Sequence, residues 1–102
     1  SERDSVVMRV VIRSVDGRQL YSSYERGDSL RMVLSEMTRG LKESVKLNGQ
    51  GGRIRAWMPS SAAFGADGSK EFGVGPNATL DYEIELLDVD QYANRSRRGN
   101  LR

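Results

Sequence analysis

The sequence predicts an α+β fold, in which a mostly antiparallel sheet of about five strands packs on one short helix. Several segments alternate apolar and polar residues, as half-buried strands do. The pattern changes at residues 40–47, where Leu41 and Val45 are four apart, which is the spacing of one helix face. The 102 residues, 37% of them hydrophobic, suit a single domain with a core of moderate size.

The first predicted strand covers residues 6–15, in which apolar and basic side chains alternate. Its two faces carry Met8, Val10 and Ile12 on one side and Arg9 and Arg13 on the other. Asp16 and Gly17 tolerate the positive φ of a tight hairpin, so residues 18–22 are expected to return antiparallel to this strand. Residues 30–34 alternate in the same way and form a further short strand.

A short helix is predicted at residues 40–47, where Leu41 and Val45 share one face. Three glycines within residues 48–52 are expected to end it, because glycine adopts the left-handed conformation that closes helices at little cost. The same segment lacks the Lys-Ser/Thr pair of a phosphate-binding loop, so a turn is the preferred interpretation. Strand-like alternation follows at residues 53–58.

The clearest alternation in the chain predicts a final strand at residues 80–86. Apolar side chains on one face alternate with acids on the other, namely Leu80, Tyr82, Ile84 and Leu86 against Asp81, Glu83 and Glu85. Arg53 and Arg55 of the preceding strand are expected to pair with these acids across neighbouring strands.

The residue types that are missing exclude several kinds of chemistry. Without His or Cys, the chain has no Ser-His-Asp triad, no thiolate nucleophile, no disulfide and no zinc site of the usual ligands. Asp88 and Asp90 are a candidate pair for a hard cation, yet carboxylates on a strand more often face solvent, so no metal or cofactor is predicted. Apolar runs of at most three residues predict a soluble chain without a membrane span, and they leave the compartment open.

Charge is unevenly distributed along the chain. Residues 92–102 hold four arginines and no acid, whereas residues 1–91 hold 12 basic and 14 acidic side chains. The preferred interpretation is a domain at residues 1–91 followed by a basic, flexible tail. The alternative is that the tail docks nucleic acid or an acidic membrane surface. Because four charges on a flexible end do not make a positive surface, no nucleic-acid partner is predicted.

Two segments in the second half of the chain carry a family resemblance. Residues 58–65 read Met-Pro-Ser-Ser-Ala-Ala-Phe-Gly, and residues 75–87 read Gly-Pro-Asn-Ala-Thr-Leu-Asp-Tyr-Glu-Ile-Glu-Leu-Leu. They resemble the patterns Ile-Pro-x-x-Leu-Ala-Tyr-Gly and Ile-Pro-Pro-Asn-Ala-Thr-Leu-x-Phe-x-Val-Glu-Leu of the FKBP-type peptidyl-prolyl cis–trans isomerases, the macrolide-binding immunophilins. Three further segments match that family in order, at residues 16–23, 26–34 and 40–41.

The resemblance implies a five-stranded sheet around a short helix and a shallow apolar pocket that takes the prolyl ring of a client peptide or protein. It implies no cofactor. Carried over position by position, the pocket is lined by Val10, Leu20, Tyr21, Leu30, Met37, Thr38, Leu41, Phe64, Val74 and Tyr82. The implied catalytic residues among them are Leu20, Tyr21, Leu41, Phe64 and Tyr82, and the others are implied to bind the substrate. The Thr38 N–H is implied to contact a ligand carbonyl.

Several of these positions depart from the family pattern. Leu41 stands in place of a Trp floor, and Leu20 and Tyr21 replace Phe and Asp. Phe64 lacks the hydroxyl of the usual Tyr, and the ring of Tyr21 is large enough to occupy the cavity itself. The resemblance therefore implies an X-Pro isomerase with weakened activity and weakened macrolide binding. The alternative is a non-catalytic module of the same fold that binds proteins or acts as a chaperone.

Overall fold

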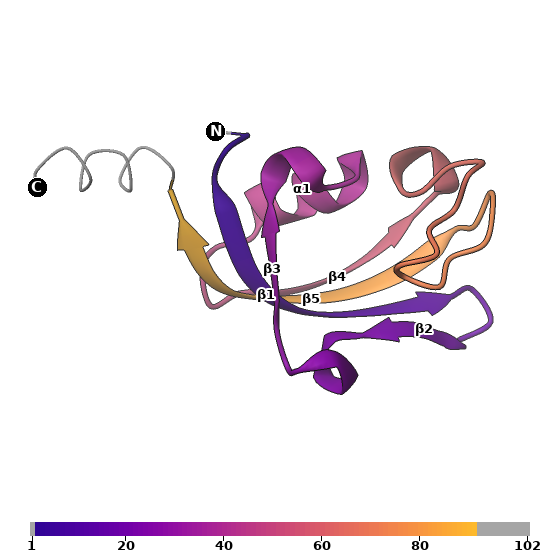
Figure 1. Ribbon diagram of the computed structural model, residues 1–102, viewed down its shortest axis with the longest axis horizontal. Helices are drawn as coiled ribbons and strands as arrows, with labels where there is room; N and C mark the ends of the chain where they lie inside the picture. The colour runs from indigo at the N-terminus through magenta and orange to yellow at the C-terminus, as the bar shows by residue number, and fades with distance from the viewer. Residues whose placement is uncertain (1, 92–102) are drawn as a thin grey trace, which may run out of the picture.

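The sheet is built from antiparallel strands in the computed structural model, which describes residues 2–91. Its strands are β1 (Ser5–Ser14), β2 (Gln19–Ser22), β3 (Leu30–Val33), β4 (Arg53–Met58) and β5 (Leu80–Asp90). The helix α1 (Arg39–Leu47) lies against the concave face of the curved sheet (Figure 1). Short 3₁₀ helices lie at Ser23–Arg26, Leu34–Glu36 and Ser60–Ala62. The predicted α+β class, with five strands and one α-helix in the described residues, is confirmed.

β1 is the central strand of the sheet because it pairs with three others. β5 pairs along its whole length, from Ser5 opposite Asp90 to Ser14 opposite Leu80. β2 and β3 pair with successive parts of the other edge of β1, and β4 pairs with β5. The pairing with the first residues of β1 carries β5 to Asp90, beyond the predicted end at residue 86.

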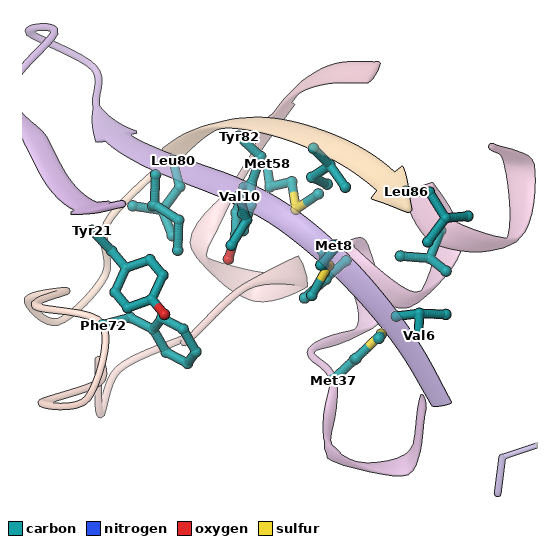
Figure 2. Packing of buried hydrophobic residues seen from close by; sticks show 14 of the residues in the cluster. Val6, Met8, Val10, Tyr21, Met37, Met58, Phe72, Leu80, Tyr82 and Leu86 are labelled. Carbon is teal, nitrogen blue, oxygen red and sulfur yellow. The ribbon is translucent and has the colours of Figure 1, made fainter. Parts of the chain in front are cut away.

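The apolar faces of β1 and β5 form the hydrophobic core together with α1 (Figure 2). The side chains that these strands contribute are at most 2% exposed, and they are Val6, Met8, Val10, Ile12, Leu80, Tyr82, Ile84 and Leu86. Leu41 and Val45 of α1 join this cluster, as their four-residue spacing predicts. Full burial of one large apolar side chain stabilises a fold by about 1.5–3 kcal/mol, so this layer is the main source of stability.

Gly40 lets α1 approach the end of β4 more closely than any larger residue permits. A Cβ atom at this position would lie 2.6 Å from the Met58 sulfur and 2.9 Å from the Ala62 carbonyl oxygen. The Met58 side chain can turn aside, but the Ala62 carbonyl belongs to the backbone and moves only with its chain. The first turn of the helix is therefore pressed against β4 and the 3₁₀ helix that follows it.

The helix ends at Leu47, as predicted, but the predicted glycine cap is wrong. Asn48 leaves the helix in an extended conformation, with φ −88° and ψ 143°. The left-handed glycine is Gly51, with φ +83°, in the turn that leads to β4. This turn is tied to β5, because the Gly51 N–H donates to the Leu86 carbonyl at 2.6 Å and the Leu86 N–H donates to the Gly52 carbonyl at 2.9 Å.

The other face of the sheet is charged, and its basic and acidic side chains pair across strands. Arg55 donates two hydrogen bonds to Asp81, at 3.1 and 2.6 Å. Arg53 and Arg9 lie 3.3 and 3.2 Å from the Glu85 carboxylate. The predicted pairing of Arg53 and Arg55 with acids of the last strand is therefore confirmed.

The predictions about metal, membrane and nucleic-acid binding concern different parts of the chain. Residues 2–91 contain no group of three or more His, Cys, Asp or Glu that could hold a metal ion, and Asp90 lies 3.9 Å from Arg31. In the same part of the chain, no helix combines the length and the apolar character needed to cross a bilayer. The basic segment 92–102, with its nucleic-acid alternative, lies outside the described residues.

Candidate active site

A cavity of about 190 Å³ opens on the concave side of the sheet, beside the first turn of α1. Its lining comes from β1, β3, β5, the start of α1 and the loop between β4 and β5. The lining residues are Met8, Val10, Ile12, Leu30, Met32, Glu36, Thr38, Leu41, Phe64, Ser69, Glu71, Phe72 and Tyr82. An apolar cavity of about 150 Å³ holds benzene, so the space is sufficient for the smaller five-membered ring of proline.

The geometry of regular elements explains why these side chains meet. Successive residues of a strand point to opposite faces of the sheet, so Met8, Val10 and Ile12 all reach the cavity from β1. Tyr82 does the same from β5, and Leu41, which is 6% exposed, reaches the cavity from the first turn of α1. Most of the apolar lining is therefore held by the sheet and the helix, and the loop between β4 and β5 adds Phe64 and Phe72.

Six of the ten residues that the sequence predicted line the cavity. They are Val10, Leu30, Thr38, Leu41, Phe64 and Tyr82. The other four, Leu20, Tyr21, Met37 and Val74, are not part of the lining. Tyr21, Met37 and Val74 are 6–9% exposed and belong to the hydrophobic core, against which Leu20 packs. These four residues therefore lie in or against the same hydrophobic core as much of the lining.

Leu20 and Val74 are placed by contacts between β2 and the loop that precedes β5. A Cβ atom at Gly73 would lie 2.9 Å from the Leu20 carbonyl oxygen, so the loop backbone packs directly on β2. Val74 and Ser69 exchange two backbone hydrogen bonds of 2.8 Å, which fold the loop back on itself. Met37 joins the core near the beginning of β1 (Figure 2).

Tyr21 leaves the cavity open and supports an aromatic wall. Its ring packs edge-on against Phe72, with ring centroids 4.7 Å apart and an interplanar angle of 66° (Figure 2). Phe72 stacks in turn on Phe64, with centroids 5.6 Å apart. The guanidinium of Arg26 lies 5.7 Å from the centroid of the Tyr21 ring, where a cation–π attraction helps to hold it. The Tyr21 ring, although large enough to occupy the cavity, therefore lies outside its lining.

Seven residues of the lining go beyond the sequence prediction. They are Met8, Ile12, Met32, Glu36, Ser69, Glu71 and Phe72. Met8 and Ile12 share the alternation of Val10, so the two-residue period of the strand is the signal that finds them. Phe72 comes from a loop without periodicity, and the sequence pattern holds no signal for it.

Two hydroxyl groups, of Tyr82 and Thr38, are buried at the cavity without a hydrogen-bond partner among the described residues. Burial raises the pKa of Tyr82 to about 12, so the phenol stays protonated at neutral pH. The nearby Thr38 hydroxyl opposes this rise in pKa, although the two groups do not meet the geometry of a hydrogen bond. Glu36 and Glu71, which are exposed, place two carboxylates at the mouth of the cavity.

This lining suits the binding of an apolar ring rather than the breaking of a covalent bond. The chain has no His and no Cys to act as a base or a nucleophile. The site offers a largely apolar surface and two buried hydroxyl groups. Such a site can favour one conformation of a ligand over another without moving a proton.

Comparison with known proteins leads to the family already suggested by the motifs. The family model for the FKBP-type peptidyl-prolyl cis-trans isomerase matches residues 1–87. The FKBP-type peptidyl-prolyl cis-trans isomerase FkpA of Escherichia coli is 35% identical over 88 residues, which cover 86% of this chain and 32% of the relative. The chain therefore spans less than half of the length of that relative.

Solved structures give the same result. The crystal structure of FkpA from Escherichia coli matches with a TM-score of 0.80 and 34% identity, over 88% of this chain and 41% of that chain. The crystal structure of a peptidyl-prolyl cis-trans isomerase from Pseudomonas syringae pv. tomato matches with a TM-score of 0.76 and 27% identity, over 89% of this chain and 65% of that chain. Fold, motifs and family model agree, and the chain belongs to the FKBP-type peptidyl-prolyl cis–trans isomerase family.

Proposed function

We propose that this domain accelerates rotation about X-Pro peptide bonds in proline-containing peptides or proteins, by binding the prolyl ring in the cavity beside α1. The observation that carries the proposal is the cavity itself. It measures about 190 Å³ and has a largely apolar lining. It persists although Leu41, Tyr21 and Phe64 all depart from the family pattern.

The proposed mechanism needs an environment rather than a reactive group. Rotation about a peptide bond breaks amide resonance, with a barrier of about 18–20 kcal/mol, and an X-Pro bond takes tens to hundreds of seconds to isomerise unaided. The twisted transition state separates less charge than the planar amide. An apolar site that excludes water therefore favours the twisted state over the ground state.

Each lining residue has a proposed part in holding that state. Leu41 forms the floor, Leu30 and Tyr82 form walls, and Phe64 forms the rim. The Thr38 N–H is proposed to donate to a ligand carbonyl, because Thr38 is the N-cap of α1 and the first N–H groups of a helix have no partner within it. The residues behind the lining, Leu20, Tyr21, Met37 and Val74, are proposed to act only by supporting it.

Two departures from the family pattern are expected to make the activity modest. Leu41 supplies an apolar floor without an aromatic platform, and aromatic pairing contributes about 0.5–1.5 kcal/mol beyond area burial. Phe64 has no hydroxyl to donate, and a typical hydrogen bond contributes about 1 kcal/mol net. The same losses are expected to weaken the binding of macrolides.

An NMR exchange assay on a short proline peptide tests the proposal. We expect the cis–trans exchange rate of the peptide to rise in proportion to the concentration of the chain. Leu41→Ala should lower this acceleration, because it removes the floor of the cavity. The matched control is Leu47→Ala, the same substitution on the same helix at a side chain that is 84% exposed. An exchange rate that stays unchanged at high protein concentration would contradict the proposal.

The alternative function is a non-catalytic module that binds proteins or acts as a chaperone. The loss of the aromatic floor at Leu41 and of the hydroxyl at Phe64 favours it. It predicts that the peptide binds while its exchange rate stays unchanged. It also predicts that binding survives both Leu41→Ala and Phe64→Ala, whereas loss of binding in these variants places the contact in the cavity.

A further inference from the structure

The inner part of the cavity holds a buried hydroxyl group that the fold leaves unsatisfied. Tyr82 is 1% exposed, and its hydroxyl has no hydrogen-bond partner among residues 2–91. In Figure 2 the Tyr82 oxygen is directed into the space between Phe72 and Met8, both of which line the cavity. Burial of a hydroxyl without a partner is unfavourable, so this group lowers the stability of the fold as long as no partner binds it.

Thr38 carries the second hydroxyl at this place, and this hydroxyl does not cap the helix although Thr38 is the N-cap residue. It is the N-cap residue of α1, where a threonine oxygen usually accepts a hydrogen bond from an N–H of the first turn. Here the side chain makes no such bond, and its Oγ1 atom is buried in the cavity lining without a partner. Two hydroxyl groups from different elements therefore lie close together at one cavity, and their geometry falls short of a hydrogen bond between them.

We propose that the Tyr82 and Thr38 hydroxyls donate hydrogen bonds to a carbonyl oxygen of the bound peptide, so that Tyr82 determines affinity and specificity at this site. The inference rests on the proposed function, because it takes the ligand to be a peptide with its prolyl ring in the cavity. The groups on the protein side are donors beside the N-terminal end of α1, whose positive dipole end favours an acceptor. Every X-Pro peptide carries such an acceptor next to the prolyl ring.

The protonation of Tyr82 agrees with a donor role. Its pKa is raised to about 12, so the group keeps its proton over the whole physiological range of pH. The donor is also fixed before the ligand arrives, because the Tyr82 side chain is held in the core. An ordered water with two polar partners is the competing occupant of this place, and the experiment separates the two.

The test combines two isosteric substitutions with one change in the peptide. Tyr82→Phe and Thr38→Val each remove a hydroxyl and keep the shape of the side chain. We expect Tyr82→Phe to raise the Kd of a proline tetrapeptide, measured by NMR titration, about fivefold, which is the worth of one hydrogen bond. Thr38→Val should act in the same direction, and the effects of the two variants should be less than additive because both groups serve one oxygen.

The peptide change identifies the acceptor. In a thioamide peptide the oxygen before proline is replaced by sulfur, which is a poorer acceptor. The wild-type chain should bind the thioamide more weakly than the parent peptide, and Tyr82→Phe should lose most of this discrimination. Tyr24→Phe is the matched control, because it removes a tyrosine hydroxyl from a side chain that is 53% exposed and outside the cavity.

Equal or tighter binding of the peptide by both Tyr82→Phe and Thr38→Val overturns the inference, and it assigns the hydroxyls to a bound water or to no ligand at all. Failure of the proposed function looks different, because the wild-type chain then shows no peptide binding in the first place. If Tyr82→Phe does not fold, Thr38→Val and the thioamide peptide still decide the question.

Discussion

Asp81 and Tyr82 are neighbours in β5, yet the protein treats their polar groups in opposite ways. Both are almost fully buried, at 2% and 1% exposure. On the charged face of the sheet, the Asp81 carboxylate accepts two hydrogen bonds from Arg55. On the apolar face, the Tyr82 hydroxyl has no partner among the described residues.

Of these two neighbours in β5, the residue whose polar group has no partner is the one that lines the cavity. The same strand, one residue earlier, satisfies a buried charged group with a bidentate ion pair, so the sheet is able to supply partners where stability alone is at stake. Buried polar groups in native proteins are nearly always hydrogen-bonded. Three side chains of the described residues are exceptions: the Tyr82 and Thr38 hydroxyls lie where a ligand is proposed to bind, and the Asn48 amide lies at the end of α1.

The largest expected effect comes from creating an unpaired group on the charged face. Arg55→Met leaves the Asp81 carboxylate buried without its partner, and an uncompensated buried charge is strongly destabilising. We expect the urea midpoint of unfolding to fall clearly. Arg53→Met is the control, because the Glu85 side chain that it leaves behind is 23% exposed and also pairs with Arg9. Equal losses in the two variants would show that the Asp81 pair contributes no more than a surface pair.

On the apolar face, removal of an unpaired polar group should stabilise the free protein. Tyr82→Phe removes a hydroxyl whose burial is not compensated, so the free energy of unfolding without ligand should rise by about 1 kcal/mol. Urea unfolding of the free protein measures it, with Tyr24→Phe as the unchanged control. A loss of stability in Tyr82→Phe would mean that the hydroxyl has a partner in the free protein, and the contrast with Asp81 would disappear.

The smallest effect concerns a partly exposed acid of the charged face and depends on pH. The hydrogen bond from Arg9 holds the pKa of Glu85 below its ordinary value of 4.5. The folded state therefore binds fewer protons at this group than the unfolded state. Its contribution to stability is complete above pH 4.5 and is lost as the pH falls through the folded-state value.

Between about pH 7 and about pH 3, a range that includes the ordinary carboxyl pKa values of about 4, the free energy of unfolding should therefore decline less steeply for Glu85→Gln than for the wild type. Glu43→Gln should keep the wild-type profile, since this side chain is 65% exposed and its pair with Arg39 is 3.8 Å long. A profile for Glu85→Gln that matches the wild type would assign the acid sensitivity to other carboxyls.

The strands and the helix could be predicted from the sequence where their apolar residues recur at a regular spacing. Alternation located β1 and β5 and placed Arg53 and Arg55 opposite the acids of β5, and four-residue spacing located α1. The end of α1 was predicted at the right residue for the wrong reason, because the hydrogen bonds that hold Gly51 and Gly52 come from Leu86 in a distant strand. Local propensity carries no information about such tertiary bonds.

The site could be predicted only where its residues lie on regular elements or match a family motif. Val10 and Tyr82 were found in this way, whereas Phe72 was missed because its position depends on how one loop folds back on β2. The place of the Tyr21 ring depends on Phe72 in turn, so it was also out of reach. Unsatisfied hydroxyls are a property of three-dimensional packing, and no sequence pattern reports them.

The absence of a side chain at Gly40 has a consequence for the cavity, although Gly40 is not part of the cavity lining. It sets the gap between α1 and β4, and Leu41 is the next residue along the helix. A methyl group at residue 40 would lie too close to the Ala62 carbonyl, so the helix would have to move away from it. The Leu41 side chain would move with the helix. The depth of the cavity is therefore set in part by a residue outside it, through how closely the first turn of α1 packs on β4 and on the 3₁₀ helix Ser60–Ala62.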